Sequence, residues 1–300
     1  MPLEGACPLC GCSDFVVKYV LADESFRTVT CNKCKFSFMH PYPSDEFLDD
    51  YYKNKAVHGF EGESLDTYVR PLNDRIVLFE NLLRKIDPPL TGGHAVDFGA
   101  GAGLAVAALK RLGFDAIGTE KNPRSAAVAK KLFGVEIVDQ TLDELPGSIR
   151  LFTMFDVLEH IKYPVEFLRY AASRMSADAC FIGAVPNYNS IGRILHGTES
   201  ASLAFPDHVN QFTKGSLIKT LNDSGFDVLY TGFPPPYGAT ITLGLRNWLA
   251  IALKPSPLRR FLMKTATLIK KYLVYPLPNI FAERTGLFGQ SLVFVARRRA

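Results

Sequence analysis

The sequence predicts an α/β fold in which helices cover a mainly parallel sheet, preceded by a small cysteine-rich unit. Three observations support this prediction. The stretch His94–Gly103 has the pattern of a short apolar strand, a glycine-rich turn and the start of a helix. Strand and helix signals alternate after that stretch, as in successive βαβ units. Two Cys-x-x-Cys pairs stand close together near the N-terminus.

Composition and the first residues bound the class of protein. The chain has 300 residues and is 47% hydrophobic, enough to form the core of one large domain or two smaller ones. We expect no secretory signal, because no basic segment followed by an apolar one opens the chain. The sequence has no apolar run of about 20 residues, the length that would indicate a membrane span. We therefore expect a cytoplasmic protein, in which clustered cysteines indicate a metal site more than disulfides.

The two cysteine pairs predict a zinc ribbon over residues 1–43. The four thiolates of Cys7, Cys10, Cys31 and Cys34 can form a tetrahedral sulfur site, the geometry that Zn²⁺ prefers. Four protein ligands leave no open position on the metal, so its role would be structural. Short strands are expected at 14–19 and 26–30. The alternatives are two unrelated reduced pairs, or Cys12 as a competing ligand.

Residues 44–90 are expected to form a helical linker and a cover helix. The Ser44 hydroxyl can cap a helix that runs through Tyr51. A polar stretch at 54–64 is predicted to be a loop. Apolar residues then repeat at helical spacing from Leu72 to Ile86, which predicts a helix packed on the coming sheet.

A core domain is expected over residues 91–233. Its later strands are predicted at 115–119, 136–138, around 151–155 and 225–233, and one further strand is predicted to end at 187. Helices are predicted at 104–112 and 126–133, and another is predicted to begin near 214. A last strand is expected within 288–300, at 290–296. Cys180 lies in an apolar strand and is expected to be a small core residue.

The glycine-rich turn predicts a site for a nucleotide-like ligand. Glycines allow the backbone to approach the ligand, and the N–H groups of the following helix face it. The spacing does not fit the dinucleotide pattern Gly-x-Gly-x-x-Gly, because Leu104 or Val106 falls where its last glycine is required. Glu120 ends the next predicted strand, where a carboxylate can accept both hydroxyls of a ribose. The alternative is an ordinary strand-to-helix turn.

These residues, together with the string Phe155-Asp-Val-Leu-Glu-His160, resemble the class I S-adenosylmethionine-dependent methyltransferases over roughly two thirds of the chain. The resemblance implies a Rossmann-like seven-stranded sheet whose last strand is antiparallel. One departure is Arg150, which stands where the family usually has an aspartate at the start of its fourth strand. That position is far from the ligand end of the strand.

The resemblance also implies that S-adenosylmethionine is the cofactor. The candidate cofactor residues are Asp97, Gly99, Ala100, Gly101, Glu120, Lys121, Asp139, Gln140, Phe155 and Asp156. In the family, the loop that carries Asp139 and Gln140 borders the adenine. Both residues could equally be solvated turn residues.

Two histidines are candidate general bases. His160 follows a strand end and titrates near neutral pH, although Glu159 and His160 could instead cap or orient the next helix. His208 lies in a loop that covers the acceptor pocket of the resembling enzymes, with Asp207 or Asn210 available to orient a substrate. Positioning of the reactants supplies much of the acceleration, so a base is needed only when a hydroxyl or an acidic carbon accepts the methyl group.

An unusual basic segment occupies residues 234–287. No acidic residue occurs from Val228 through Ala282, and apolar residues from Leu258 to Tyr272 follow helical spacing. Residues 254–275 could therefore form an amphipathic helix on an anionic membrane at the inner face. The alternative is a helix packed on its own domain or on a dimer partner. We expect no nucleic-acid binding, because the net charge is only +4.

The sequence thus predicts a methyltransferase that acts on a small molecule. By resemblance to ribbon-bearing enzymes, the acceptor is expected to be a sugar or glycan precursor methylated on oxygen or carbon, with a lipid-linked form as one possibility. The competing hypothesis is a non-catalytic scaffold or nucleoside-binding protein.

Overall fold

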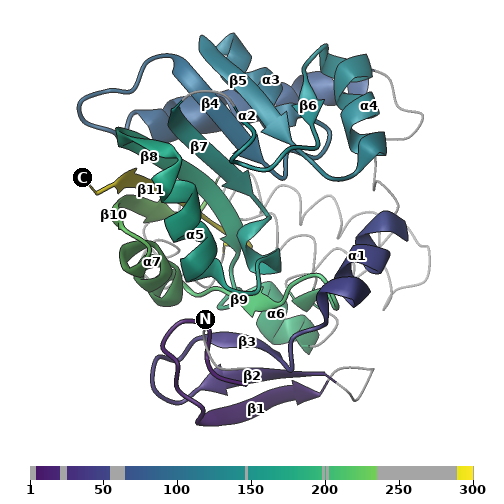
Figure 1. Ribbon diagram of the computed structural model, residues 1–300, viewed down its shortest axis with the longest axis vertical. Helices are drawn as coiled ribbons and strands as arrows, with labels where there is room; N and C mark the ends of the chain where they lie inside the picture. The colour runs from purple at the N-terminus through teal and green to yellow at the C-terminus, as the bar shows by residue number, and fades with distance from the viewer. Residues whose placement is uncertain are drawn as a thin grey trace, which may run out of the picture.

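Two sheets organise the part of the chain that the computed structural model describes (Figure 1). The described residues are 5–20, 26–54, 65–145, 148–197, 200, 203–234 and 289–299. The predicted loop at 54–64 and the basic segment at 234–287 lie almost wholly outside them.

The larger sheet has seven strands, and all but one of them run parallel. In order across the sheet they are β6 (Ile137–Val138), β5 (Phe114–Thr119), β4 (Gly93–Phe98), β7 (Ile149–Phe155), β8 (Met175–Pro186), β11 (Ser291–Arg298) and β10 (Phe226–Gly232). The last strand, β11, inserts between β8 and β10 and is antiparallel to both. This arrangement confirms the predicted sheet with its final antiparallel strand.

Helices cover both faces of this sheet because its central strands are apolar on both sides. In β7, Leu151 packs into one hydrophobic core and the next residue, Phe152, packs into the other. The first core also contains buried residues of α2 (Leu65–Leu83) and α3 (Leu104–Arg111), and Ala129 of α4 (Pro123–Phe133). The second contains buried residues of α5 (Pro164–Ser173) and α7 (Lys214–Asp223). The predicted cover helix is thus α2.

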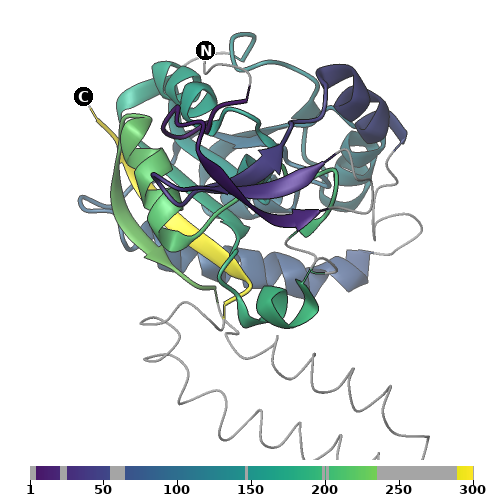
Figure 2. The ribbon, with the colours of Figure 1, turned by 90° about the horizontal axis from the view of Figure 1, so that it is seen from below.

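The smaller sheet has the order β1 (Phe15–Val20), β2 (Arg27–Cys31), β3 (Ser37–His40) and β9 (Asn210–Gln211). We call the described residues up to 43, which carry its first three strands, the ribbon. The first two strands were expected from the sequence, and the other two were not. The strand β9 comes from the segment after the core strand β8, so the ribbon is joined to the core by backbone pairing. Seen from below, the ribbon strands lie in front of the larger sheet (Figure 2).

Short helices connect these parts. The helix α1 (Asp45–Asn54) begins as predicted, with the Phe47 N–H donating to the Ser44 hydroxyl at 3.1 Å. A single 3₁₀ turn, η1 (Leu158–His160), follows β7, and α6 (Ile191–His196) follows β8. Among the described residues, no helix combines the length and the apolar character that crossing a bilayer requires.

Candidate functional site

The glycine turn after β4 leaves room for a ligand against the backbone. Gly99 and Ala100 both donate their N–H to the Thr119 carbonyl at 2.9 Å, which ties the turn to the end of β5. Gly99 has a φ of 73°, and a Cβ there would lie 2.5 Å from a methyl of Val157, so no side chain fits. Gly101 has a φ of 50°, and a Cβ there would meet no atom within 4 Å. The turn is therefore closed on one side and open on the other.

Glu120 follows β5 directly, and its side chain lies across this turn. One of its carboxylate oxygens accepts from the Gly101 N–H at 3.1 Å, and the other accepts from the Asn122 N–H at 3.0 Å. These two bonds fix the plane of the carboxylate beside the open face of the turn. Each oxygen keeps a second lone pair, which can accept a hydroxyl of a ligand.

Asp97 ends β4 directly before the turn, and its side chain is buried. Its carboxylate accepts from the Thr153 hydroxyl at 2.6 Å. Burial raises the pKa of Asp97 to about 6, although that hydrogen bond and the charge of Arg75 both act to lower it. A second cationic group near this carboxylate would favour its charged form.

Arg75 of α2 reaches the same end of the sheet. Its guanidinium lies 4.2 Å from the centre of the Phe155 ring and interacts electrostatically with Asp97 and Asp156. Burial lowers the pKa of Arg75, and its buried Nη1 has no hydrogen-bond partner within the described part of the chain. An unpaired buried donor costs about 1–3 kcal/mol, so this nitrogen is suited to receive an anionic group of a ligand.

Arg75 was not predicted to be a site residue, because only the apolar residues of the cover helix were used to predict its packing. Arg75 lies three residues after Leu72 and four before Phe79, both of which are fully buried. A cation on the buried face of an amphipathic helix was the signal that could have found it.

Asp156 follows β7 in a left-handed conformation with a φ of 56°. Its N–H donates to the Ala184 carbonyl at 3.0 Å, which fixes the loop to the end of β8. Burial raises the pKa of Asp156, while Arg75 and His208 oppose that shift. The predicted cofactor residues Asp97, Phe155 and Asp156 thus share one end of the sheet with Arg75.

The two predicted histidines come together from different segments. The centroids of the His160 and His208 rings lie 5.0 Å apart, with the rings edge to face. The His160 ring contacts two backbone carbonyls: Nδ1 is 2.7 Å from that of Asp207, and Nε2 is 3.1 Å from that of Asp156. Glu159 is buried next to both rings, with one oxygen 3.9 Å from His208 Nε2 and 4.0 Å from His160 Nε2. Burial raises the pKa of Glu159 well above its usual range.

Asn210 was expected to orient a substrate, but both ends of its side-chain amide are engaged by the protein. Its Oδ1 accepts from the Tyr42 hydroxyl at 2.7 Å, and its Nδ2 donates to the Ile161 carbonyl. The residue is buried. Its observed contacts therefore join the ribbon to the loop after η1.

Three predicted cofactor residues lie at the surface. The Lys121 side chain is 86% exposed and points to Asp49 of α1, with 3.9 Å between the charged atoms. Asp139 and Gln140 are exposed in the loop after β6.

The four predicted metal ligands lie together in the ribbon, and their ligand atoms are all within 4.8 Å of one another. The sulfurs of Cys7 and Cys34 are 3.5 Å apart, and those of Cys10 and Cys31 are 3.6 Å apart. A tetrahedral site with Zn–S bonds of about 2.3 Å requires sulfurs about 3.8 Å apart, so the cluster fits Zn²⁺. Cys180 is buried in β8, as expected.

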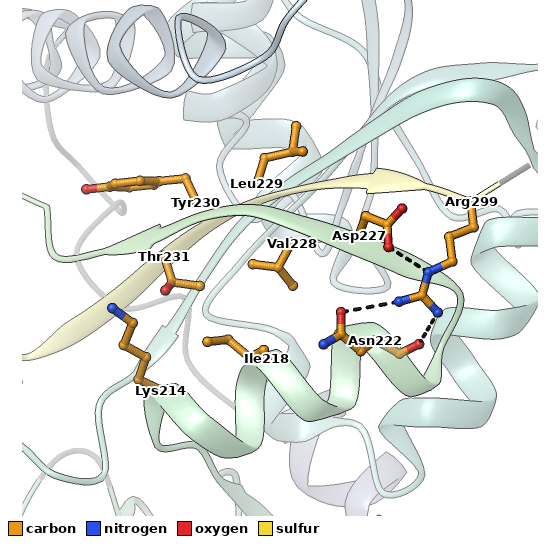
Figure 3. Close-up of a pocket in the computed structure, with 9 residues that line it drawn as sticks. All are labelled: Lys214, Ile218, Asn222, Asp227, Val228, Leu229, Tyr230, Thr231 and Arg299. Carbon is orange, nitrogen blue, oxygen red and sulfur yellow. Dashed lines mark hydrogen bonds and ion pairs between the residues drawn. The ribbon is translucent and has the colours of Figure 1, made fainter.

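A surface hollow between α7 and β10 lies away from these residues (Figure 3). Lys214 and Tyr230 line it, and Arg299 is paired there with Asp227 at 2.7 Å. Because β11, β8 and β7 separate β10 from β4, this hollow is not part of the candidate site.

Comparison with known proteins gives the family. A methyltransferase domain model matches residues 72–231. A ubiquinone biosynthesis O-methyltransferase from Caulobacter sp. (strain K31) is 32% identical over 108 residues, which is 33% of this chain and 43% of that protein. The chain therefore spans less than half the length of this curated relative.

One solved structure with a TM-score of 0.50 supports the fold. A SAM-dependent methyltransferase from Archaeoglobus fulgidus has a TM-score of 0.50 and 16% sequence identity, over 85% of this chain and 100% of that one. The magnesium protoporphyrin IX methyltransferase of Synechocystis PCC 6803 has a TM-score of 0.47 and 15% sequence identity, over 84% of this chain and 96% of that one. The strand order, the acidic glycine-rich turn and the family match agree, and the chain therefore belongs to the class I S-adenosylmethionine-dependent methyltransferases.

Proposed function

We propose that the protein transfers the methyl group of S-adenosylmethionine to a small-molecule acceptor next to His208. The observation that carries this proposal is the Glu120 carboxylate, held by two backbone N–H groups at the open face of the glycine turn. Its remaining lone pairs would accept the two ribose hydroxyls. Gly99, Ala100 and Gly101 would lie against the nucleoside.

The methionyl end of the donor would lie toward Asp97, Asp156 and Arg75. Its ammonium group would pair with the two carboxylates, whose raised pKa values reflect burial. Its carboxylate would accept from the unpaired Nη1 of Arg75. Lys121, Asp139 and Gln140 remain candidates for the adenine side, where they are exposed in the loops after β5 and β6.

The cofactor supplies an already activated methyl group on its sulfonium, so the main work of the chain is to orient the acceptor. We propose His208 as the general base that removes the acceptor proton. The His160 ring is the less favourable base, because both of its nitrogens face backbone carbonyls. A His160→Gln and His208→Gln pair tests this choice: the greater loss of turnover, with an unchanged cofactor affinity, identifies the base.

The acceptor is proposed to be a sugar or glycan precursor, free or lipid-linked, methylated on oxygen or carbon. The resemblance to ribbon-bearing sugar enzymes supports this class. The name of the Caulobacter relative favours an oxygen acceptor instead of a carbon one. Methyl-labelled S-adenosylmethionine offered with nucleotide sugars, and separately with polyprenyl-linked sugars, would identify the class by transfer of label.

Calorimetry with S-adenosylhomocysteine tests the donor assignment. We expect one site per chain with micromolar affinity. Absence of binding at millimolar ligand would favour the competing hypothesis, a scaffold built on the same fold. Binding of NAD in place of S-adenosylhomocysteine would contradict the assignment of the cofactor.

We also propose that the four ribbon cysteines bind structural Zn²⁺. The sulfur distances support a tetrahedral site. Elemental analysis of the purified protein should find about one zinc per chain. Cys12 is the residue to test if a Cys10→Ser variant keeps its metal, because it lies next to the cluster in sequence.

Peripheral membrane contact through residues 254–275 is a further proposal, and it concerns residues outside the described ranges. It rests on the basic, amphipathic pattern of the sequence. Changing Arg259, Arg260 and Lys264 to Glu should lower sedimentation with phosphatidylserine vesicles. The matched control changes three exposed lysines on the surface of the core domain to Glu, namely Lys110, Lys130 and Lys131. Equal sedimentation of both variants would contradict a specific contact.

A further inference from the structure

We propose that the cysteine-held ribbon fixes the position of residues 205–213, so that metal occupancy controls the acceptor side of the site and leaves the donor side unchanged. The consequence for catalysis rests on the function proposed for His208, which this segment carries. The structural part of the proposal, that the ribbon orders the segment, can be tested separately.

Backbone pairing is the first link. The two-residue strand β9 pairs antiparallel with β3 of the ribbon, with Ser37 opposite Gln211 and Phe38 opposite Asn210. The Met39 N–H also donates to the Val209 carbonyl at 2.8 Å. A strand of two residues is far too short to be stable by itself, so the order of β9 depends on β3.

Buried side chains form the second link. Phe36 directly precedes β3, and its ring centroid lies 5.4 Å from that of Phe212; both residues are almost fully buried. The Tyr42 hydroxyl donates to Asn210 Oδ1 at 2.7 Å. The core beneath the segment is therefore supplied in part by the ribbon.

The third link joins β9 to the histidines. The Gln211 side-chain amide donates to the His208 carbonyl at 2.8 Å. The Asp207 carbonyl lies 2.7 Å from His160 Nδ1. A displacement of β9 would therefore move His208 and remove a support of the His160 ring.

The four cysteines lie next to the turn from which these contacts begin. The Cys31 N–H donates to the Phe36 carbonyl at 2.9 Å, and the Lys35 N–H donates to the Cys31 carbonyl at 2.9 Å, so the second cysteine pair lies in one turn that leads directly into β3. The first pair meets this turn at the sulfurs of Cys7 and Cys34. Small metal domains commonly depend on the ion for their folding.

Most supports of the donor side are separate from the ribbon and the histidines. Asp156 is the exception, because its carbonyl lies 3.1 Å from His160 Nε2. The glycine turn is tied to β5, and Glu120 is bound to the turn itself. Arg75 comes from α2 and packs on Phe155 of β7. These contacts are made by core residues alone, which is why the two sides should respond differently to metal loss.

Hydrogen–deuterium exchange of the full chain tests the proposal, with Zn²⁺ bound and after removal by a chelator. We expect exchange of peptides covering 205–213 to accelerate by about tenfold or more, together with the ribbon strands, because buried hydrogen bonds are lost. Peptides covering β4 and β5, and the affinity for S-adenosylhomocysteine, should not change. Faster exchange in the ribbon alone would overturn the proposal.

A variant that keeps the metal gives an independent test. Tyr42→Phe retains the ring and removes only the bond to Asn210, so zinc content should stay constant while exchange at 205–213 rises about fivefold. The control Asn32→Ala removes a 2.9 Å bond to Asp14 at the metal end of the ribbon and should leave 205–213 unchanged. Equal exchange at 205–213 in the two variants would overturn the proposal.

If chelation unfolds the whole chain, this pair of variants still tests whether the ribbon orders residues 205–213. A failure of S-adenosylhomocysteine to bind in any sample would contradict the proposed function, and the exchange results would still test the ribbon. The two failures are therefore distinguishable.

Discussion

Replacing Arg75 with Met should weaken binding of S-adenosylhomocysteine by about 10- to 150-fold. Methionine has a similar length and keeps the packing against Phe155, whose ring centre lies 4.2 Å from the guanidinium. The variant loses the buried Nη1, which has no partner among the described residues and which we assign to the carboxylate of the cofactor. A hydrogen bond to a charged group contributes about 1.5–3 kcal/mol, which gives the stated range.

A second ligand makes this assay specific. 5′-Methylthioadenosine has the same nucleoside and sulfur as the cofactor product but lacks the amino acid. Arg75→Met should therefore leave its affinity within about twofold of the wild-type value, since it has no carboxylate to lose. Calorimetry measures both affinities. Equal losses for the two ligands, or no loss for either, would refute the assignment of Arg75.

Three further variants test other parts of the account. Glu120→Ala should weaken S-adenosylhomocysteine and 5′-methylthioadenosine alike by at least tenfold, because both carry the ribose; unchanged calorimetric affinities would remove the ribose assignment. Asp97 has a pKa of about 6, above the unfolded value of about 3.9, so the folded wild type loses stability as pH rises through that window. At pH 7, Asp97→Asn should consequently have a free energy of unfolding up to about 3 kcal/mol higher than that of the wild type, whereas at pH 4 the two proteins should be about equally stable. A difference in stability that does not change with pH would count against the raised pKa of Asp97. Cys31→Ser should abolish zinc binding and destabilise the ribbon, as measured by elemental analysis and exchange, and retention of the metal would contradict its role as a ligand.

Local patterns were sufficient to predict most of the fold. The glycine turn, the carboxylate that ends β5 and the cysteine spacing are each encoded within a few neighbouring residues. Their spatial meeting follows from the topology of a parallel sheet, whose strand ends share one edge. The antiparallel last strand could be predicted only through the family resemblance, because its partners in the sheet, β8 and β10, are far away in sequence.

Long-range features were not predicted from the sequence. The strand β3 is four residues long and β9 is two, and neither shows an alternating pattern strong enough to be recognised. Arg75 was hidden within a helix that otherwise has an ordinary apolar stripe. The burial of Glu159 next to two histidines depends on a contact between η1 and the segment after α6, which no local pattern reveals.

A crystal structure of the protein with bound S-adenosylhomocysteine would show whether the donor lies against the glycine turn. We expect both ribose hydroxyls to contact the Glu120 carboxylate, the amino acid to lie between Asp97 and Arg75, and the sulfur to face His208. Ligand density elsewhere, or an empty turn after β4 at saturating ligand, would contradict this placement.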